Sequence, residues 1–269
     1  MKLKALLVIF NIVLFSLLFT IFFLPLFFAY GSFMREFWNT NWIFGPIFLT
    51  LIIAINVIFF KNRKLIEAIE TEDWTALAMY LEEEVFDKKK FKFRNIKLLT
   101  DALFLLSDFN SLDRLQLALK THKPEYLNRL APKFAAAKML SGKYADLVEF
   151  SSKFNSSGKD EWMLFYSGLA LYMTKDLYKS AEQFKSAQTK TDDSLIKVLS
   201  SYILFHLLKH YNRMTDADVL SEKKDLKAFI DKTYTKQTWN TYTETQQREI
   251  HIMVLKKLIA DSSVWLWEA

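Results

Sequence analysis

The stretch LFYSGLALYMTKDLYKSAEQFKSA, residues 164–187, contains two helical patterns separated by a short turn at Lys175 and Asp176. Apolar and small side chains recur every three or four residues on both sides of this turn, which is the period of a helix with one buried face. A similar turn recurs along the chain and ends each time in a large apolar residue. These residues are Trp74, Phe109, Tyr144, Leu177 and Tyr211, at spacings of 35, 35, 33 and 34 residues. Such a period predicts stacked helix pairs, an α-solenoid.

The composition favours the same fold class. The 269 residues are 51% hydrophobic and 25% charged, which is too apolar for a disordered chain. Only five are glycine and four are proline, so β-hairpin turns and glycine-rich phosphate-binding loops lack their usual residues. The absence of cysteine excludes disulfides, thiolate metal ligands and cysteine nucleophiles. We therefore expect an all-α protein.

The repeat spacing resembles that of the tetratricopeptide repeat (TPR) family, whose unit is a helix–turn–helix of 34 residues. In the best copy, the matching residues are Leu164, Gly168, Leu171, Asp176, Leu177, Ser180, Phe184 and Ala187. The other copies are degenerate, because none combines the family's tryptophan, leucine and glycine. The resemblance implies a TPR-like α-solenoid of about five helix pairs over residues 61–231. Residues 232–269 would form its C-terminal cap, with a helix near residues 246–259.

Two stretches without charge precede the repeats, residues 5–30 and residues 42–60. Each is long enough to cross about 30 Å of hydrocarbon as a helix. A cleaved signal peptide is the competing interpretation of the first stretch, but its apolar run is too long for one. The sequence therefore predicts a transmembrane helical hairpin over residues 1–60.

The charges that flank this hairpin predict its orientation. Lys2 and Lys4 precede the first stretch, and Lys61, Arg63 and Lys64 follow the second. Positive flanks stay in the cytoplasm, so we expect two spans in the cytoplasmic (inner) membrane, with both termini cytoplasmic.

Two details of the hairpin affect its packing and its connection to the repeats. Asn11 and Asn56 lie in opposite spans, where their amides can hydrogen-bond to each other; we interpret them as intramembrane packing residues. Residues 61–71 are predicted to continue the second span as one helix, which would couple the repeats stiffly to the membrane.

A basic segment after the first repeat is predicted to contact the membrane surface. Its residues are Lys88, Lys89, Lys90, Phe91, Lys92, Phe93, Arg94 and Lys97. Cations attract anionic headgroups, and aromatic rings can enter the interface. Glu82, Glu83, Glu84 and Asp87 lie just upstream and would cancel part of this field, so a solvated loop is an equal alternative. We expect no nucleic-acid binding.

No motif indicates catalysis. His206 and His210 stand four residues apart, which resembles half of a zinc site, but the glutamate of a zinc protease does not follow His206. We therefore expect no enzyme activity, no catalytic or metal-binding residues, no cofactor and no small-molecule substrate.

Repeat proteins of this shape commonly bind a partner along the first helices of their pairs. By the resemblance, the residues that would face this groove are Lys97, Asp101, Phe104, Phe165, Tyr172 and His206. The three aromatic residues could instead be core residues. The leading hypothesis is a membrane-anchored scaffold or adaptor that recruits a protein partner. The alternative is a structural subunit of a larger membrane-bound protein complex, with the hairpin packed on other membrane helices.

Overall fold

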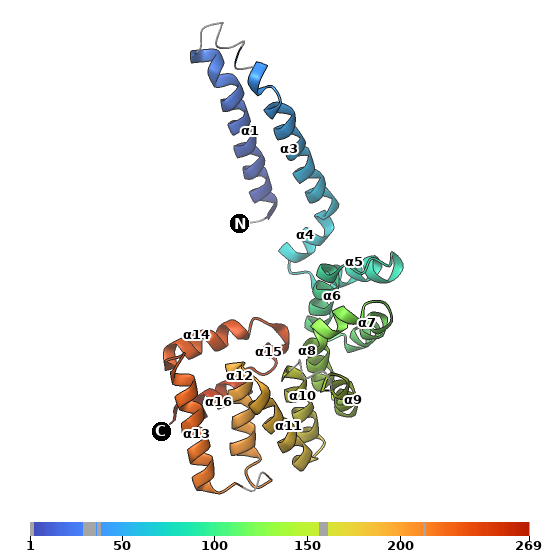
Figure 1. Ribbon diagram of the computed structural model, residues 1–269. Coiled ribbons are helices and arrows are strands. Elements are labelled where there is room, and N and C mark those ends of the chain that lie inside the picture. The colour runs from blue at the N-terminus through green and yellow to red at the C-terminus, as the bar shows by residue number, and fades with distance from the viewer. Residues whose placement is uncertain (1–2, 29–35, 37–38, 156–160, 212–213, 269) are drawn as a thin grey trace. The chain divides into compact units, whose positions relative to one another are not determined.

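The computed structural model describes residues 3–28, 36, 39–155, 161–211 and 214–268 (Figure 1). All regular elements within these residues are helices, which confirms the all-α class for this part of the chain. The end of the first predicted span, residues 29 and 30, lies outside the described residues. The chain divides into two compact units, Met1–Lys90 and Phe91–Ala269.

The first unit begins with two apolar helices, α1 (Leu3–Phe28) and α3 (Phe44–Lys61), which lie side by side (Figure 1). Among the described residues, one helix, Asn39–Lys61, is long and apolar enough to cross a membrane. The apolar stretch described within α1, Leu7–Ile21, is shorter. No residue of α3 is buried. The structure thus contains one candidate membrane-spanning helix, and the second span stays a prediction.

Two short helices follow in this unit, α4 (Arg63–Glu70) and α5 (Trp74–Glu82), and α5 continues into a π-helix, η1 (Glu83–Asp87). The prediction of an unbroken helix over residues 61–71 is wrong. The helix ends at Asn62, whose backbone has φ −101° and ψ 10°. The Asn62 side chain donates a hydrogen bond to the carbonyl oxygen of Ile58 at 2.7 Å, and so satisfies an acceptor at the helix end.

The second unit contains successive helices joined by short connections. The first three pairs are α6 (Phe93–Leu105) with α7 (Phe109–His122), α8 (Pro124–Leu140) with α9 (Tyr144–Asn155), and α10 (Glu161–Met173) with α11 (Leu177–Lys190). The next pair is α12 (Ser194–Tyr202), extended by the π-helix η2 (Ile203–Leu207), with α13 (Asp216–Asp231). Neighbouring helices pack on each other, and α8 also contacts α6 and α10.

Four of the predicted turns have the same backbone geometry. Each contains a residue with positive φ: Glu72 (53°), Ser107 (56°), Gly142 (72°) and Lys175 (65°). The next residue donates its N–H to the carbonyl five residues earlier, as Asp108 does to Leu103 at 2.9 Å, which is the hydrogen bond of a Schellman motif. The second helices then begin at the expected positions, Trp74, Phe109, Tyr144 and Leu177.

The fifth turn differs from this prediction. The repeat period predicts a helix from Tyr211, but α13 begins at Asp216. Thr215 and Asp218 form a capping box, in which each side chain accepts the other's backbone N–H, at 3.2 and 2.8 Å. This reciprocal cap favours a helix start five residues later than the repeat period indicates.

The C-terminal region forms three helices, α14 (Lys236–Gln246), α15 (Ile250–Met253) and α16 (Lys256–Trp267). The predicted continuous helix over residues 246–259 is therefore wrong. Tertiary contacts hold the separate pieces, with α15 on α8 and α16 on α12 and α13. Trp239 of α14 is fully buried, and its Nε1 donates to the Ser263 hydroxyl of α16 at 3.0 Å.

Candidate functional site

Aromatic contacts gather three helix ends of the second unit. The Phe91 ring lies 5.1 Å from the His122 ring at the end of α7, and the Phe93 ring lies 5.2 Å from Tyr126 in α8. The Arg129 guanidinium also packs over the Phe93 ring, at 3.8 Å from its centroid. Both phenylalanines are half-buried. They join the start of α6 to the α7–α8 connection rather than projecting freely into the surroundings.

Several cations surround these rings. Lys92, Arg94 and Lys97 are exposed and form no close ion pair within the described residues, although the charge of Lys97 acts on the Asp101 carboxylate one helical turn later. Lys123, from the α7–α8 connection, lies 3.9 Å from the exposed Glu125 carboxylate. A contact of this length between exposed groups contributes little energy. The positive charge at this end of the second unit is therefore largely uncompensated.

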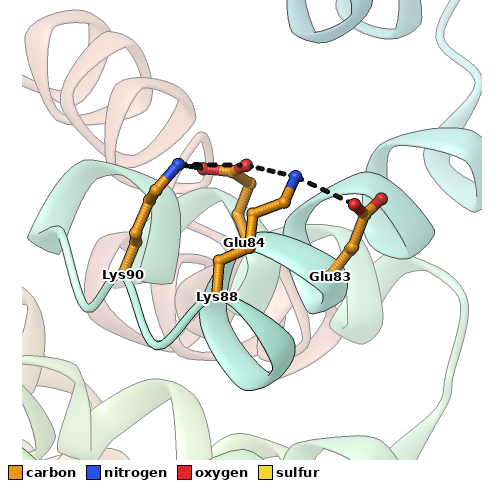
Figure 2. A network of polar contacts seen from close by, with 4 residues as sticks. All are labelled: Glu83, Glu84, Lys88 and Lys90. Carbon is orange, nitrogen blue, oxygen red and sulfur yellow. Dashed lines mark hydrogen bonds and ion pairs between the residues drawn. The ribbon is translucent and has the colours of Figure 1, made fainter.

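The lysines that precede this end, in the first unit, have a different environment. Figure 2 shows the Lys88 ammonium between the Glu83 and Glu84 carboxylates, at 2.8 and 2.9 Å, with Lys90 at 3.1 Å from Glu84. Hydrogen bonds from Lys88 lower the pKa of both carboxyls. The π-helix η1 carries both glutamates, and its end brings Lys88 back toward them. Two of the predicted membrane-contacting cations are thus balanced within the chain.

The residues predicted to bind a partner do not form one open surface. Phe104 is 4% exposed and Phe165 is 0% exposed, and the Phe165 ring lies 5.5 Å from the Phe184 ring. This burial places both phenylalanines in the core, because neither side chain can reach a partner without unfolding. The more accessible members of the set are Lys97, Asp101, Tyr172 and His206.

A buried lysine of α8 pairs with a half-buried aspartate of α6. The Lys133 ammonium, only 7% exposed, forms an ion pair with the Asp101 carboxylate, and Glu249 approaches Lys133 at 3.9 Å. Burial raises the pKa of Asp101 above its ordinary value, although Lys133 opposes that shift. No local sequence pattern predicts this pair, because its two members are 32 residues apart.

His251 of α15 joins this cluster. The Tyr166 hydroxyl donates to the His251 carbonyl at 2.6 Å, and the Trp162 ring meets the imidazole edge-on at 5.2 Å. Both imidazole nitrogens are buried and find no hydrogen-bond partner within the described residues. Desolvation lowers the pKa of His251 to about 4, so the ring is neutral at pH 7.

The C-terminal helices therefore cover part of the first-helix face that a partner was expected to use. α15 lies against α8 and α10, through Glu249 and His251. α16 lies against α12, where the Trp265 and Tyr202 rings are 5.8 Å apart. Helices α15 and α16 of the same chain thus cover much of this face.

The two histidines considered for metal binding, His206 and His210, do not form a metal site with other described residues. The His206 ring stacks on the Tyr202 ring at 5.1 Å, and both His206 and His210 are exposed. Within the described residues, no group of three His, Asp or Glu side chains is arranged to hold a metal ion.

The described residues of the second unit include two surface hollows. One, of about 470 Å³, lies between α11, α12 and α13, and the other, of about 660 Å³, lies between α14 and α16. None of the predicted partner-binding residues lines either hollow. Both linings mix lysines, glutamates and apolar side chains, without a cluster that indicates a reaction.

In the first unit, the predicted asparagine pair is formed. Asn56 Nδ2 donates to Asn11 Oδ1 at 2.9 Å, and Asn11 Nδ2 donates back at 3.4 Å. Each amide also donates to the carbonyl four residues earlier, Leu7 for Asn11 and Ile52 for Asn56. The two side chains thus satisfy each other and link α1 to α3.

Comparisons with known proteins give a family but no activity. Residues 111–268 match the family described as "Uncharacterised Treponema protein". A protein from Treponema pallidum (strain Nichols), named only as an uncharacterized protein, is 31% identical over 283 aligned residues, covering 99% of this chain and 88% of that relative. No solved structure matches the chain.

Proposed function

Because this chain belongs to the family of uncharacterised Treponema proteins, whose description names no activity, we propose a function from its architecture. We propose that the protein is a membrane-anchored scaffold or adaptor. A two-span hairpin would hold a TPR-like solenoid in the cytoplasm, and the solenoid would bind a protein partner and recruit it to the membrane.

The observation that carries this proposal is the connection of a candidate membrane helix, Asn39–Lys61, to a series of helix pairs. The side-by-side packing of α1 and α3 supports a hairpin anchor, because the paired asparagines leave no amide unsatisfied in an apolar environment. The proposal includes the domain boundaries predicted from the sequence, with the anchor ending at residue 60 and the solenoid at residue 231.

The four recurring turns support the TPR-like part. A left-handed residue followed by a helix cap recurs with the repeat period. Gly168 and Ser180 occupy the family's small positions, and the Ser180 hydroxyl donates to the Gly168 carbonyl at 2.8 Å. The fifth pair departs from the pattern, as do the motifs of the other copies.

Partner binding is assigned to members of the predicted set that are exposed or half-buried. Lys97, Tyr172 and His206 are available, whereas Phe104 and Phe165 support the helices from inside. The C-terminal helices leave less of the first-helix face open than the resemblance implies, so the partner would bind beside them.

Site-specific photocrosslinking in cells tests the adaptor proposal. A photoreactive amino acid is placed at Tyr172 or His206, and the matched control is Tyr178, which is 64% exposed on the second helix of its pair. We expect a discrete adduct with a soluble protein from the first two positions and none from Tyr178. Equal adducts from all three positions, or no adduct, would contradict the proposal.

Topology is tested separately, because the chain has no native cysteine. A single cysteine at Lys190, exposed at the end of α11, should be protected from a membrane-impermeant maleimide in intact cells and react after lysis. Labelling in intact cells would place the second unit outside and overturn the cytoplasmic orientation.

The occupied first-helix face favours a second candidate, a structural subunit of a larger membrane-bound complex. A solenoid whose first-helix face is covered by its own C-terminal helices is suited to a structural role. Detergent extraction separates the two functions: a subunit should co-purify with other membrane proteins, whereas an adaptor should come alone or with a soluble partner.

A further inference from the structure

The structure brings together basic residues that the sequence separates. The end of the second unit is built from residues 91–97 at the start of α6 and residues 120–130 at the α7–α8 connection, joined by the Phe91–His122 and Phe93–Tyr126 contacts. These residues include six lysines and arginines and one glutamate. We call this surface the basic end. Its positive field comes from two segments.

The upstream lysines do not add to this field. Residues 82–90 contain four carboxylates and three lysines. Lys88 and Lys90 are bound to Glu83 and Glu84 (Figure 2). The basic segment therefore has two parts: residues 88–90, whose charge is largely neutralised by the glutamates, and residues 91–97, whose charge is not.

The aromatic residues of the basic end are occupied in packing. The Phe93 ring contacts Tyr126 on one side and the Arg129 guanidinium at 3.8 Å. Phe91 likewise lies against His122. Inserting either ring into a bilayer would break the contacts that hold the three helix ends together, so the surface is suited to electrostatic contact without insertion.

We propose that the basic end binds anionic phospholipid headgroups at the membrane surface, through Lys92, Arg94 and Lys97 of the first segment and Lys123 and Arg129 of the second. This inference rests on the proposed membrane anchor. It adds a second membrane contact, and it transfers that role from Lys88 and Lys90 to Lys123 of the α7–α8 connection and Arg129 of α8.

Anionic lipid is favoured over nucleic acid by the rest of the chain. The candidate membrane helix ends at Lys61, 30 residues before Phe91, so the bilayer is always present at a high effective concentration. Residues 61–269 contain 33 lysines and arginines against 29 aspartates and glutamates, so the basic end is a local patch and not part of a broadly basic domain.

The test uses the full chain in lipid nanodiscs of phosphatidylcholine alone or mixed with phosphatidylglycerol. A donor fluorophore on Thr121→Cys reports energy transfer to an acceptor on the lipid headgroups, and Tyr178→Cys is the control position. We expect more transfer from position 121 in the anionic discs, and a decrease as salt screens the charges.

Two double variants test the two segments, Lys92→Gln with Arg94→Gln, and Lys123→Gln with Arg129→Gln. At about 1 kcal/mol per cation near an anionic surface, each should lower the ratio of docked to free states by about 30-fold at low salt. Lys185→Gln with Lys190→Gln on α11 removes two exposed lysines elsewhere and should have little effect. The Lys88→Gln and Lys90→Gln pair, combined with Glu83→Gln and Glu84→Gln, should also have little effect.

Because Arg129 packs on Phe93, its loss could loosen the helix ends. Arg129→Lys with Lys123→Gln keeps one charge and should retain intermediate docking if charge is the cause. The proposal is overturned if transfer is the same in both lipids, if the α11 variant reduces it equally, or if only one segment matters. It is also overturned if a labelled oligonucleotide binds the basic end in neutral discs at physiological salt.

These outcomes are separable from the adaptor proposal. Failure to recover a soluble partner leaves the lipid measurement unchanged. If the proposed membrane anchor is wrong, the chain will not incorporate into either kind of nanodisc.

Discussion

The His251 imidazole links one residue to the stability of the second unit. Its folded pKa is about 4, against an ordinary value of 6.5, because the ring is desolvated. The unfolded chain therefore binds the proton first as the pH falls, so this stabilisation is complete above pH 6.5 and lost between pH 6.5 and 4. The loss should reach about 3 kcal/mol.

Unfolding followed by tryptophan fluorescence at several pH values checks this, since Trp162 lies against the ring. His251→Phe should be less sensitive to acid than the unaltered chain over the same interval. Parallel curves for the two proteins would show that another group is responsible.

A second residue-scale prediction concerns Lys133, whose buried ammonium pairs with the half-buried Asp101 carboxylate and lies near Glu249. Lys133→Met leaves the half-buried Asp101 carboxylate without its ion-pair partner and should destabilise the second unit by about 2 kcal/mol. Lys133→Met with Asp101→Leu should recover much of that loss. Denaturant unfolding measures both. If the double variant is less stable than Lys133→Met alone, the charge pair is not the source of the effect.

At the scale of elements, the crossing of α10 and α11 depends on Gly168. A Cβ atom added there would lie 3.0 Å from the fully buried Phe184 ring, which is closer than ordinary van der Waals contact. Gly168→Ala should therefore destabilise the second unit by about 1–3 kcal/mol, despite the better helix propensity of alanine. A thermal melt provides the measurement. Gly168→Ala with Phe184→Leu should be closer to the unaltered chain if the clash is the cause.

The α1–α3 pair allows a matched test of its asparagines. Asn11→Leu removes the bonds between the two amides and leaves Asn56 with only its bond to the Ile52 carbonyl, so it should weaken the hairpin by about 0.6–2 kcal/mol in a bilayer. The reciprocal variant Asn56→Leu should act alike, and the double variant should cost less than the sum of the two. Additive losses, measured by steric trapping in bicelles, would show that the two amides are not coupled.

How far the sequence predicts an element depends on the range of its interactions. The turns before Trp74, Phe109 and Leu177 are predictable, because an aspartate cap and a left-handed residue act within a few positions. The break at Asn62 is not predictable from the local sequence, because asparagine does not always end a helix. The division of the C-terminal region was missed for another reason: the Tyr166–His251 hydrogen bond joins residues 85 positions apart.

The same limit applies to the candidate site. The repeat resemblance indicated which residues share the first-helix side, but it could not show that Phe104 and Phe165 are buried. The linear basic segment was recognisable, whereas its division by the Glu83 and Glu84 network depends on the return of the chain after η1. The contribution of Arg129 depends on the Phe93 contact, which no local pattern contains.

At the scale of the whole molecule, the C-terminal helices are part of the core of the second unit rather than a removable strap. Trp239 and Leu266 are fully buried, and Ile252 and Ile259 are each 2% exposed. Burial of side chains of this size stabilises a protein by about 1.5–3 kcal/mol each, an amount comparable to the total stability of a domain. A chain that ends at Lys232 should therefore lose the cooperative unfolding of the second unit.

Trp239→Ala separates this explanation from a general effect of truncation. It removes one buried ring and its hydrogen bond to Ser263, and should destabilise the full chain by about 3–5 kcal/mol. Leu220→Ala, at a residue that is 68% exposed on α13, is the control and should change little. If the truncated chain instead unfolds cooperatively at an unchanged temperature, the first-helix face is stable without the C-terminal helices. The groove would then be open to a partner along its full length, as the repeat resemblance implies.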